Sequence, residues 1–177
     1  VFFIKSHDMI FRNAHETDLP LIVELYNSNI PGRLVTADTS EVTVADKRDW
    51  FFRHNPESRP LWMVEDEGRV IGWAGFQSFY GRPAYNGTAE ISIYLKPRER
   101  GHGYGKKILM HAIEQCPKLG IRNLLGFIFA HNTASLRLFE QAGFSEWGHL
   151  PDVAVMDGKA YSLKILGLTI QPPSGQV

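Results

Sequence analysis

The chain has 177 residues, in which 19 Lys and Arg residues balance 19 Asp and Glu residues, so its formal net charge is zero. A balanced charge creates no long-range field that would attract nucleic acid or an anionic membrane, and neither is expected as a partner. Hydrophobic residues make up 44% and charged residues 21%, as is typical of globular proteins. The length fits one domain, expected over residues 9–168, with a short tail over residues 169–177.

Cysteine, histidine and the N-terminal residues exclude several further classes of protein. Cys116 is the only cysteine, which excludes an internal disulfide framework and favours a reducing, cytoplasmic location. The seven histidines lack the spacing of metal-ligand pairs, so no metal is expected. The apolar opening, residues 1–4, is too short for a signal peptide or a membrane span.

The first third of the chain predicts one strand and two helices. Residues 9–12 are predicted as a strand, and residues 17–29 as a helix whose first residue, a threonine, serves as the N-cap. Thr43 is the candidate N-cap of a second helix, which ends before Pro56 because proline disfavours a helical residue before it. Residues 31–39, between the helices, are predicted as a loop.

A predicted hairpin and a central strand follow. Residues 61–64 and 70–79 are rich in aromatic and β-branched side chains and flank a turn over residues 66–68. After a loop over residues 81–87, residues 88–95 alternate between a polar and an apolar face. The polar face carries Thr88, Glu90, Ser92 and Tyr94, and the apolar face carries Ala89, Ile91, Ile93 and Leu95.

The remaining elements complete an α/β fold. We expect a helix over residues 105–115, a strand over 123–129, a helix over 132–141, and strands over 144–149 and 161–166. This order predicts a mixed, mostly antiparallel central sheet flanked by helices.

A glycine-rich segment joins the central strand to the following helix. It reads Arg98-Glu-Arg-Gly-His-Gly-Tyr-Gly-Lys106, so three glycines lie among basic residues. Glycine adopts positive φ and lets a ligand approach the main chain, while free N–H groups at a helix start attract phosphate. The segment predicts a pyrophosphate cradle, the alternative being a plain turn. Its glycine spacing fits neither a Walker motif nor a Rossmann fingerprint.

Two motifs resemble the GNAT superfamily of N-acetyltransferases. Arg100-Gly-His-Gly-Tyr-Gly105 matches the superfamily's Arg/Gln-x-x-Gly-x-Gly/Ala signature, between a strand and a helix. The segment of residues 132–144 resembles the second cofactor segment, with Asn at a helix start and a closing Gly-Phe. The resemblance implies the GNAT acyl-CoA N-acyltransferase fold and direct transfer of an acetyl group from acetyl-CoA to an amine.

Further segments resemble the phosphinothricin and methionine sulfoximine acetyltransferases of that superfamily. They comprise residues 82–85, 88–95, 150–153 and 157–159. This resemblance implies that the acceptor is a small amino-acid-like amine, such as phosphinothricin or methionine sulfoximine. A homodimer is a further expectation.

The resemblance also implies a cofactor site. The amides of residues 101–106 are expected to bind the pyrophosphate of coenzyme A, and the main chain of residues 93–95 to pair with its pantetheine arm like an added strand. Asn132, whose alternative role is a plain helix N-cap, and Gln141, whose alternative is a solvated position, are expected to contact the cofactor. The expected cofactor-binding residues are Ile93, Tyr94, Leu95, Arg100, Gly101, His102, Gly103, Tyr104, Gly105, Lys106, Asn132 and Gln141.

Glu90 is the candidate catalytic residue. An acceptor amine is mostly ammonium at neutral pH and must lose a proton before it attacks a thioester, so a base is required. Glu90 lies on the polar face of the central strand and is expected to accept that proton, directly or through water. The alternative is a structural glutamate paired with an arginine such as Arg82.

Three residues are candidates for binding the acceptor. Arg82 is expected to pair with an acceptor carboxylate, the alternative being an ordinary solvated arginine. Tyr85 and Phe79 are candidate walls of the acceptor pocket, although aromatic residues beside a strand more often belong to the core.

Phe139 departs from the superfamily pattern. Many members have a tyrosine there, taken as the acid that protonates the departing thiolate, and phenylalanine cannot donate a proton. Water or another group must protonate the thiolate instead, or the thiolate leaves unprotonated.

Two alternative functions stay open: acetylation of another amine (a protein N-terminus, a polyamine or an aminoglycoside), and a non-catalytic coenzyme A-binding sensor.

Overall fold

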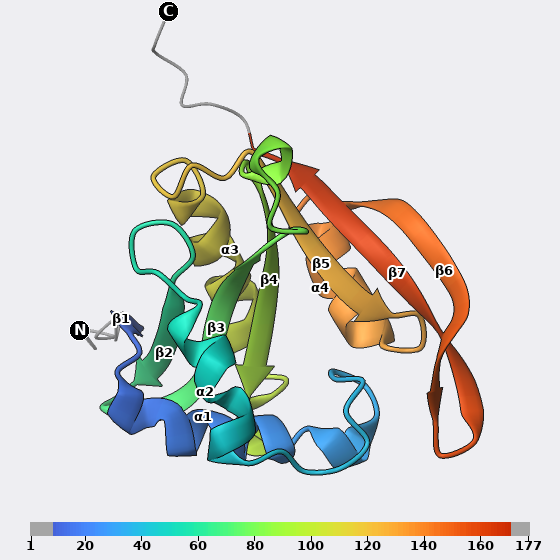
Figure 1. Ribbon diagram of the computed structural model, residues 1–177, viewed down its shortest axis with the longest axis horizontal. Helices are drawn as coiled ribbons and strands as arrows, with labels where there is room; N and C mark the ends of the chain where they lie inside the picture. The colour runs from blue at the N-terminus through green and yellow to red at the C-terminus, as the bar shows by residue number, and fades with distance from the viewer. Residues whose placement is uncertain (1–8, 171–177) are drawn as a thin grey trace, which may run out of the picture.

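The computed structural model describes residues 9–170 and is drawn in Figure 1. Within this part of the chain, seven strands form one sheet in the order β1-β2-β3-β4-β5-β7-β6. Neighbouring strands pair antiparallel, except for the parallel pair β4 and β5. The strands are β1 (Ile10–Asn13), β2 (Leu61–Asp66), β3 (Arg69–Ser78), β4 (Thr88–Leu95), β5 (Asn123–Phe129), β6 (Ser145–Met156) and β7 (Lys159–Thr169). The predicted mixed, mostly antiparallel sheet is confirmed.

Helices cover both faces of the sheet. α1 and α2 lie on one face, and α3 and α4 lie on the other (Figure 1). The helices are α1 (Leu19–Asn27), α2 (Val44–Phe52), α3 (Tyr104–Gln115) and α4 (Thr133–Gln141), and short 3-10 turns occur at η1 (Glu16–Asp18), η2 (Ile30–Gly32), η3 (Pro83–Tyr85) and η4 (Pro97–Glu99). The predicted cap of α2 is confirmed, because Thr43 Oγ1 accepts the N–H of Asp46 at 3.2 Å.

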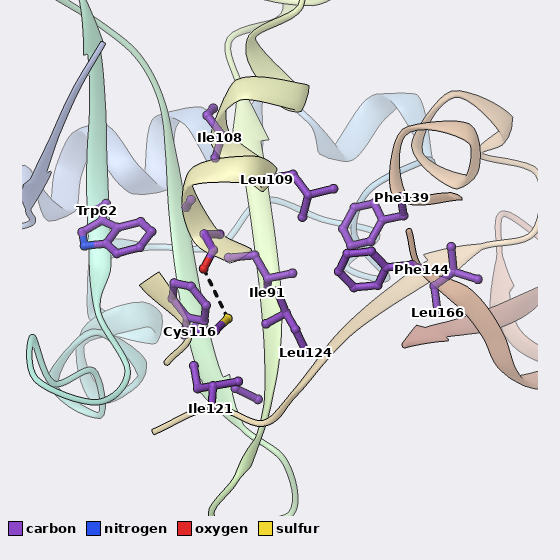
Figure 2. Packing of buried hydrophobic residues seen from close by; sticks show 14 of the residues in the cluster. Trp62, Ile91, Ile108, Leu109, Cys116, Ile121, Leu124, Phe139, Phe144 and Leu166 are labelled. Carbon is purple, nitrogen blue, oxygen red and sulfur yellow. Dashed lines mark hydrogen bonds between the residues drawn. The ribbon is translucent and has the colours of Figure 1, made fainter. Parts of the chain in front are cut away.

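The two faces of the sheet bury separate hydrophobic clusters. Ile91 of β4 packs against Ile108 and Leu109 of α3, in the same cluster as Phe139 of α4 (Figure 2). On the opposite face, Tyr94 of β4 belongs to a cluster that also holds α1 and α2 side chains. The predicted alternation of β4 is therefore confirmed, but the far end of its polar face is covered by α1.

β6 and β7 extend well beyond the strands predicted over residues 144–149 and 161–166. Pro151, which argues against a strand in the sequence, lies where the pairing of β6 with β7 is irregular, between Leu150 and Ala154. Proline is tolerated at such irregularities and on edge strands, and β6 is the edge of this sheet. Residue 169, the first residue of the expected tail, is the last of β7. Residues 171–177 and the apolar opening lie outside the described residues.

Candidate active site

The candidate active site lies where β4 and β5 separate. The parallel pairing covers Thr88–Glu90 of β4 and Asn123–Leu125 of β5. Beyond that point the two strands diverge toward their C-terminal ends (Figure 1). A cavity of about 840 Å³ opens there, lined by residues 90–95, 126–129 and 34–37, together with the glycine segment and α4.

The main chain of β4 is divided between the sheet and the cavity. The carbonyl of Thr88 accepts a hydrogen bond from the residue that follows β3, at 3.3 Å, and the N–H of Lys96 donates to a carbonyl of β3 at 2.9 Å. Alternate residues of an antiparallel strand bond to the same neighbour, so the even-numbered residues of β4 serve β3. Ile93 and Leu95 therefore turn their main-chain groups toward the cavity, whereas the main chain of Tyr94 belongs to the sheet.

The glycine segment forms an open turn at the start of α3. Gly101 and Gly103 have φ values of 80° and 81°, a region that favours glycine, and Gly103 is the N-cap of α3. A Cβ atom on either glycine would lie at least 4 Å from every other described heavy atom, apart from its chain neighbours. Both line the cavity with Gly105 and Lys106, so free N–H groups at a helix start face open space. This geometry fits an extended ligand that carries phosphate.

Arg100, at the beginning of the same segment, is held by Asn29, the N-cap of η2. Its Nη2 atom donates a hydrogen bond to Oδ1 of Asn29. Asn29 is buried, and its Nδ2 atom donates to the carbonyl of Leu25 at 2.7 Å. Although Arg100 lines the cavity, its guanidinium is therefore partly used within the protein.

Glu90 places a single carboxylate on the cavity wall. Burial raises its pKa to about 7, so that carboxylate and carboxylic acid are both present at neutral pH. No ion pair to Glu90 occurs among residues 9–170, and the alternative partner, Arg82, is exposed. A carboxylate with this pKa and no cationic partner is suited to proton transfer near neutral pH.

Sequence reasoning missed a polar network beside the cavity. The hydroxyl of Tyr26 is hydrogen-bonded to Oγ1 of Thr36 and donates to Oδ2 of Asp38 at 2.5 Å. The Nζ atom of Lys47 lies 4.0 Å from the centre of the Tyr26 ring. Mainly through burial, the pKa of Tyr26 is raised to about 12, and burial also raises the pKa of Tyr94. Both phenols are protonated donors at neutral pH; no motif in the sequence marks this network.

Asn132 has two partners within the protein. Its Oδ1 atom accepts the N–H of Ser135 at 3.2 Å, as expected of an N-cap, and its Nδ2 atom donates to the carbonyl of Leu34 at 3.1 Å. The residue lines the cavity, so the N-cap role and proximity to a ligand coexist.

Several predicted site residues do not line the cavity. Phe79, Arg82 and Tyr85 lie in the connection from β3 to β4, where the rings of Phe79 and Tyr85 are 5.5 Å apart. His102 and Gln141 are exposed. The hydroxyl of Tyr104 points elsewhere and donates to Oδ2 of Asp66 at 2.6 Å. The predicted residues that line the cavity are Glu90, Ile93, Tyr94, Leu95, Arg100, Gly101, Gly103, Gly105, Lys106 and Asn132.

Phe139 is buried and contributes to the cavity wall. Its ring packs on β5 so closely that a Cβ atom on Gly126 would lie 2.4 Å from it. The position therefore supplies an apolar surface, and no proton donor, beside the cavity.

Comparisons with known proteins define the class. The acetyltransferase (GNAT) family model matches residues 22–144, and the chain belongs to this family of acetyltransferases. The superfamily resemblance drawn from the glycine segment and residues 132–144 is confirmed.

Individual relatives are named for related reactions. A Bacillus subtilis (strain 168) protein, named putative phosphinothricin acetyltransferase YwnH, is 54% identical over 160 residues, which cover 90% of this chain and 98% of the relative. The L-methionine sulfoximine/L-methionine sulfone acetyltransferase of Pseudomonas aeruginosa is 28% identical, covering 91% of this chain and 94% of the relative. The crystal structure of a phosphinothricin acetyltransferase from Sinorhizobium meliloti in complex with acetyl-CoA has a TM-score of 0.85 and 27% identity, covering 94% of each chain.

Among residues 9–170, no helix is long and apolar enough to cross a membrane. No group of three or more His, Cys, Asp or Glu side chains in this part of the chain is arranged to hold a metal ion.

Proposed function

We propose that the protein transfers the acetyl group of acetyl-CoA directly to the amino group of a small amino-acid-like acceptor, with Glu90 as the base. The observation that carries this proposal is the carboxylate of Glu90 on the cavity wall, with a pKa of about 7. A non-catalytic coenzyme A-binding sensor has no need of such a group. The relatives named for phosphinothricin and methionine sulfoximine support the acceptor class. Residues 9–168 form the proposed catalytic domain.

The cofactor-binding residues that we propose fit an extended thioester. Amides at the start of α3, beside Gly101 and Gly103, bind the pyrophosphate, and Lys106 adds a positive charge. Main-chain groups of Ile93 and Leu95 bind the pantetheine arm, as an additional strand would be bound. Acetyl-CoA supplies an acetyl group activated as a thioester.

Glu90 prepares the acceptor in the proposed mechanism. The acceptor enters as an ammonium, and Glu90 takes one of its protons, directly or through a water molecule. The neutral amine then attacks the thioester carbonyl and a C–N bond forms. The C–S bond breaks, the coenzyme A thiolate departs, and the new amide nitrogen releases its second proton to solvent. Phe139 supplies no proton to the sulfur, so the thiolate takes one from solvent or leaves without it.

Arg82 is proposed to bind the acceptor carboxylate. Its side chain is exposed and lies outside the cavity, so this role requires the acceptor, or a second subunit, to extend the site toward η3. A homodimer is supported by β6, an edge strand that exposes Trp147, Val153 and Val155. A cytoplasmic location is supported by Cys116, a buried free thiol.

The test is an assay of thiol release with acetyl-CoA and a panel of amines. The panel contains methionine sulfoximine, methionine sulfone, phosphinothricin, a polyamine, an aminoglycoside and a peptide with a free N-terminus. We expect turnover with at least one amino-acid-like amine and a higher KM for that amine in the Arg82→Ala variant. Binding of acetyl-CoA without thiol release for any amine would support the sensor. A preference for the polyamine, the aminoglycoside or the peptide would show that the acceptor belongs to a different class of amine.

A further inference from the structure

The loop of residues 33–38, called here the 33–38 loop, forms one wall of the cavity. It follows η2 and contributes Leu34, Val35, Thr36 and Ala37 to the lining. Three of these four side chains are apolar. A loop without regular structure gains its shape from hydrogen bonds, and several partners of this loop are side chains from distant parts of the chain.

The first half of the loop is tied to the C-terminal half of the chain. Nε and Nη2 of Arg33 donate to the two carboxylate oxygens of Asp157, in the turn between β6 and β7, at 2.7 and 3.1 Å. The carbonyl of Arg33 lies 2.7 Å from Nε2 of His131, and the carbonyl of Leu34 accepts from Nδ2 of Asn132 at 3.1 Å. Two successive loop residues are therefore bonded to the β5–α4 connection and the β6–β7 turn.

The second half of the loop is tied to α1 and β4. The hydroxyl of Tyr94 donates to the carbonyl of Val35 at 3.3 Å. Thr36 Oγ1 is bonded to the hydroxyl of Tyr26 and accepts the N–H of Asp38 at 3.1 Å. Four consecutive residues, 33–36, thus have their polar groups held from four different parts of the fold, while their apolar side chains line the cavity.

We propose that Arg33 and Asp157 are positioning residues that hold the 33–38 loop, and with it part of the cavity wall available to the acceptor. The inference rests on the proposed acetyltransferase function. The segments proposed to bind acetyl-CoA lie on β4 and at the start of α3. The 33–38 loop belongs to the remaining lining, together with parts of β5, α4, β6 and β7, and this lining is available to the acceptor. Asn132 joins α4 to the 33–38 loop, because it caps α4 and donates a hydrogen bond to the carbonyl of Leu34.

The ion pair gives a clean test, because neither residue lines the cavity. Asp157→Asn and Arg33→Gln should each raise the KM of the acceptor by about two- to fivefold, the range typical of an exposed ion pair. The turnover number and the affinity for acetyl-CoA should not change. Exchanging the two charges, in the double variant R33D/D157R, should recover part of the loss. Glu16→Gln is the matched control, since it breaks an exposed pair with Arg48, of 2.6 Å, and neither of these residues lines the cavity.

Hydrogen exchange of the amides of residues 34–37 supplies a readout that does not depend on catalysis. Exchange should be faster in Asp157→Asn than in the wild type and unchanged in Glu16→Gln. An unchanged acceptor KM in both pair variants, or an equal rise in the Kd of acetyl-CoA, would overturn the proposal. If the wild type transfers no acetyl group to any amine, the proposed function fails. Unchanged hydrogen exchange in Asp157→Asn would independently overturn the positioning role of Arg33 and Asp157.

Discussion

The glycine segment, residues 100–106, and the 33–38 loop line the same cavity but are held in place differently. Gly101 and Gly103 adopt positive φ, and α3 begins directly after them, so the turn at these glycines follows from the segment's own residues. The 33–38 loop takes its shape from side chains far along the chain, such as Tyr94 and Asp157. The difference teaches that one part of a cavity wall can be encoded by neighbouring residues while another part depends on the whole fold.

Glu90 lines the same cavity as these two regions, and its replacement has the largest expected effect. Glu90→Gln keeps the shape of the side chain and removes the base, so kcat should fall by about 10²–10⁴-fold at pH 7. The affinity for acetyl-CoA should be retained, and raising the pH should restore part of the rate because more acceptor is then neutral. A variant with full activity at neutral pH would exclude Glu90 as the base.

Thermal melts of the same variant test the electrostatics. The folded-state pKa of Glu90, about 7, lies above the ordinary value of 4.5, so the folded protein binds the proton more tightly than the unfolded chain. The wild type therefore loses stability as the pH rises from about 4.5 to 7, by at most about 3 kcal/mol. Above pH 7, Glu90→Gln should melt at a higher temperature than the wild type. A lower melting temperature would indicate a structural glutamate instead.

Gly103→Val tests the glycine segment and has the next largest effect. Positive φ strains valine by about 1–3 kcal/mol, and the side chain also enters the space beside the start of α3. We expect the Kd of acetyl-CoA to rise by about tenfold or more, equal to about 1.4 kcal/mol. The control is Gly158→Val, in the β6–β7 turn, where φ is 76° and the surrounding space is equally open. Calorimetry on both folded variants separates backbone strain from exclusion of the ligand. Equal affinities of the two variants for acetyl-CoA would mean that the glycine segment is only a turn.

Removing single tyrosine hydroxyls gives the smallest effects and the sharpest contrast. Tyr26→Phe breaks bonds to Thr36 and Asp38 in the 33–38 loop. Tyr104→Phe, at the start of α3, breaks one bond to Asp66 of β2. One hydrogen bond contributes about 0.5–1.5 kcal/mol, so changes of about two- to tenfold are expected. Steady-state kinetics should show a higher acceptor KM for Tyr26→Phe and a higher acetyl-CoA KM for Tyr104→Phe. The same change in both variants would contradict the division of the cavity into two sides.

The sequence by itself determined the order of the elements and the turn of the glycine segment. The alternation of β4 and the glycine segment are short-range patterns, since side-chain direction and positive φ depend on neighbouring residues. The Asn132 cap of α4 could be predicted for the same reason. The sequence failed at β6, because Pro151 breaks the local pattern of a strand that pairing with β7 nevertheless maintains.

Only the tertiary structure decided what Glu90 and the 33–38 loop do. The pKa of Glu90 depends on burial, which results from packing and cannot be read from the neighbouring residues in the sequence. The loop shows no periodicity, and its partner Asp157 lies 124 residues away along the chain. Contacts of this kind form when the sheet brings distant segments together, and this is why the turn of the glycine segment could be predicted from its motif and the shape of the 33–38 loop could not.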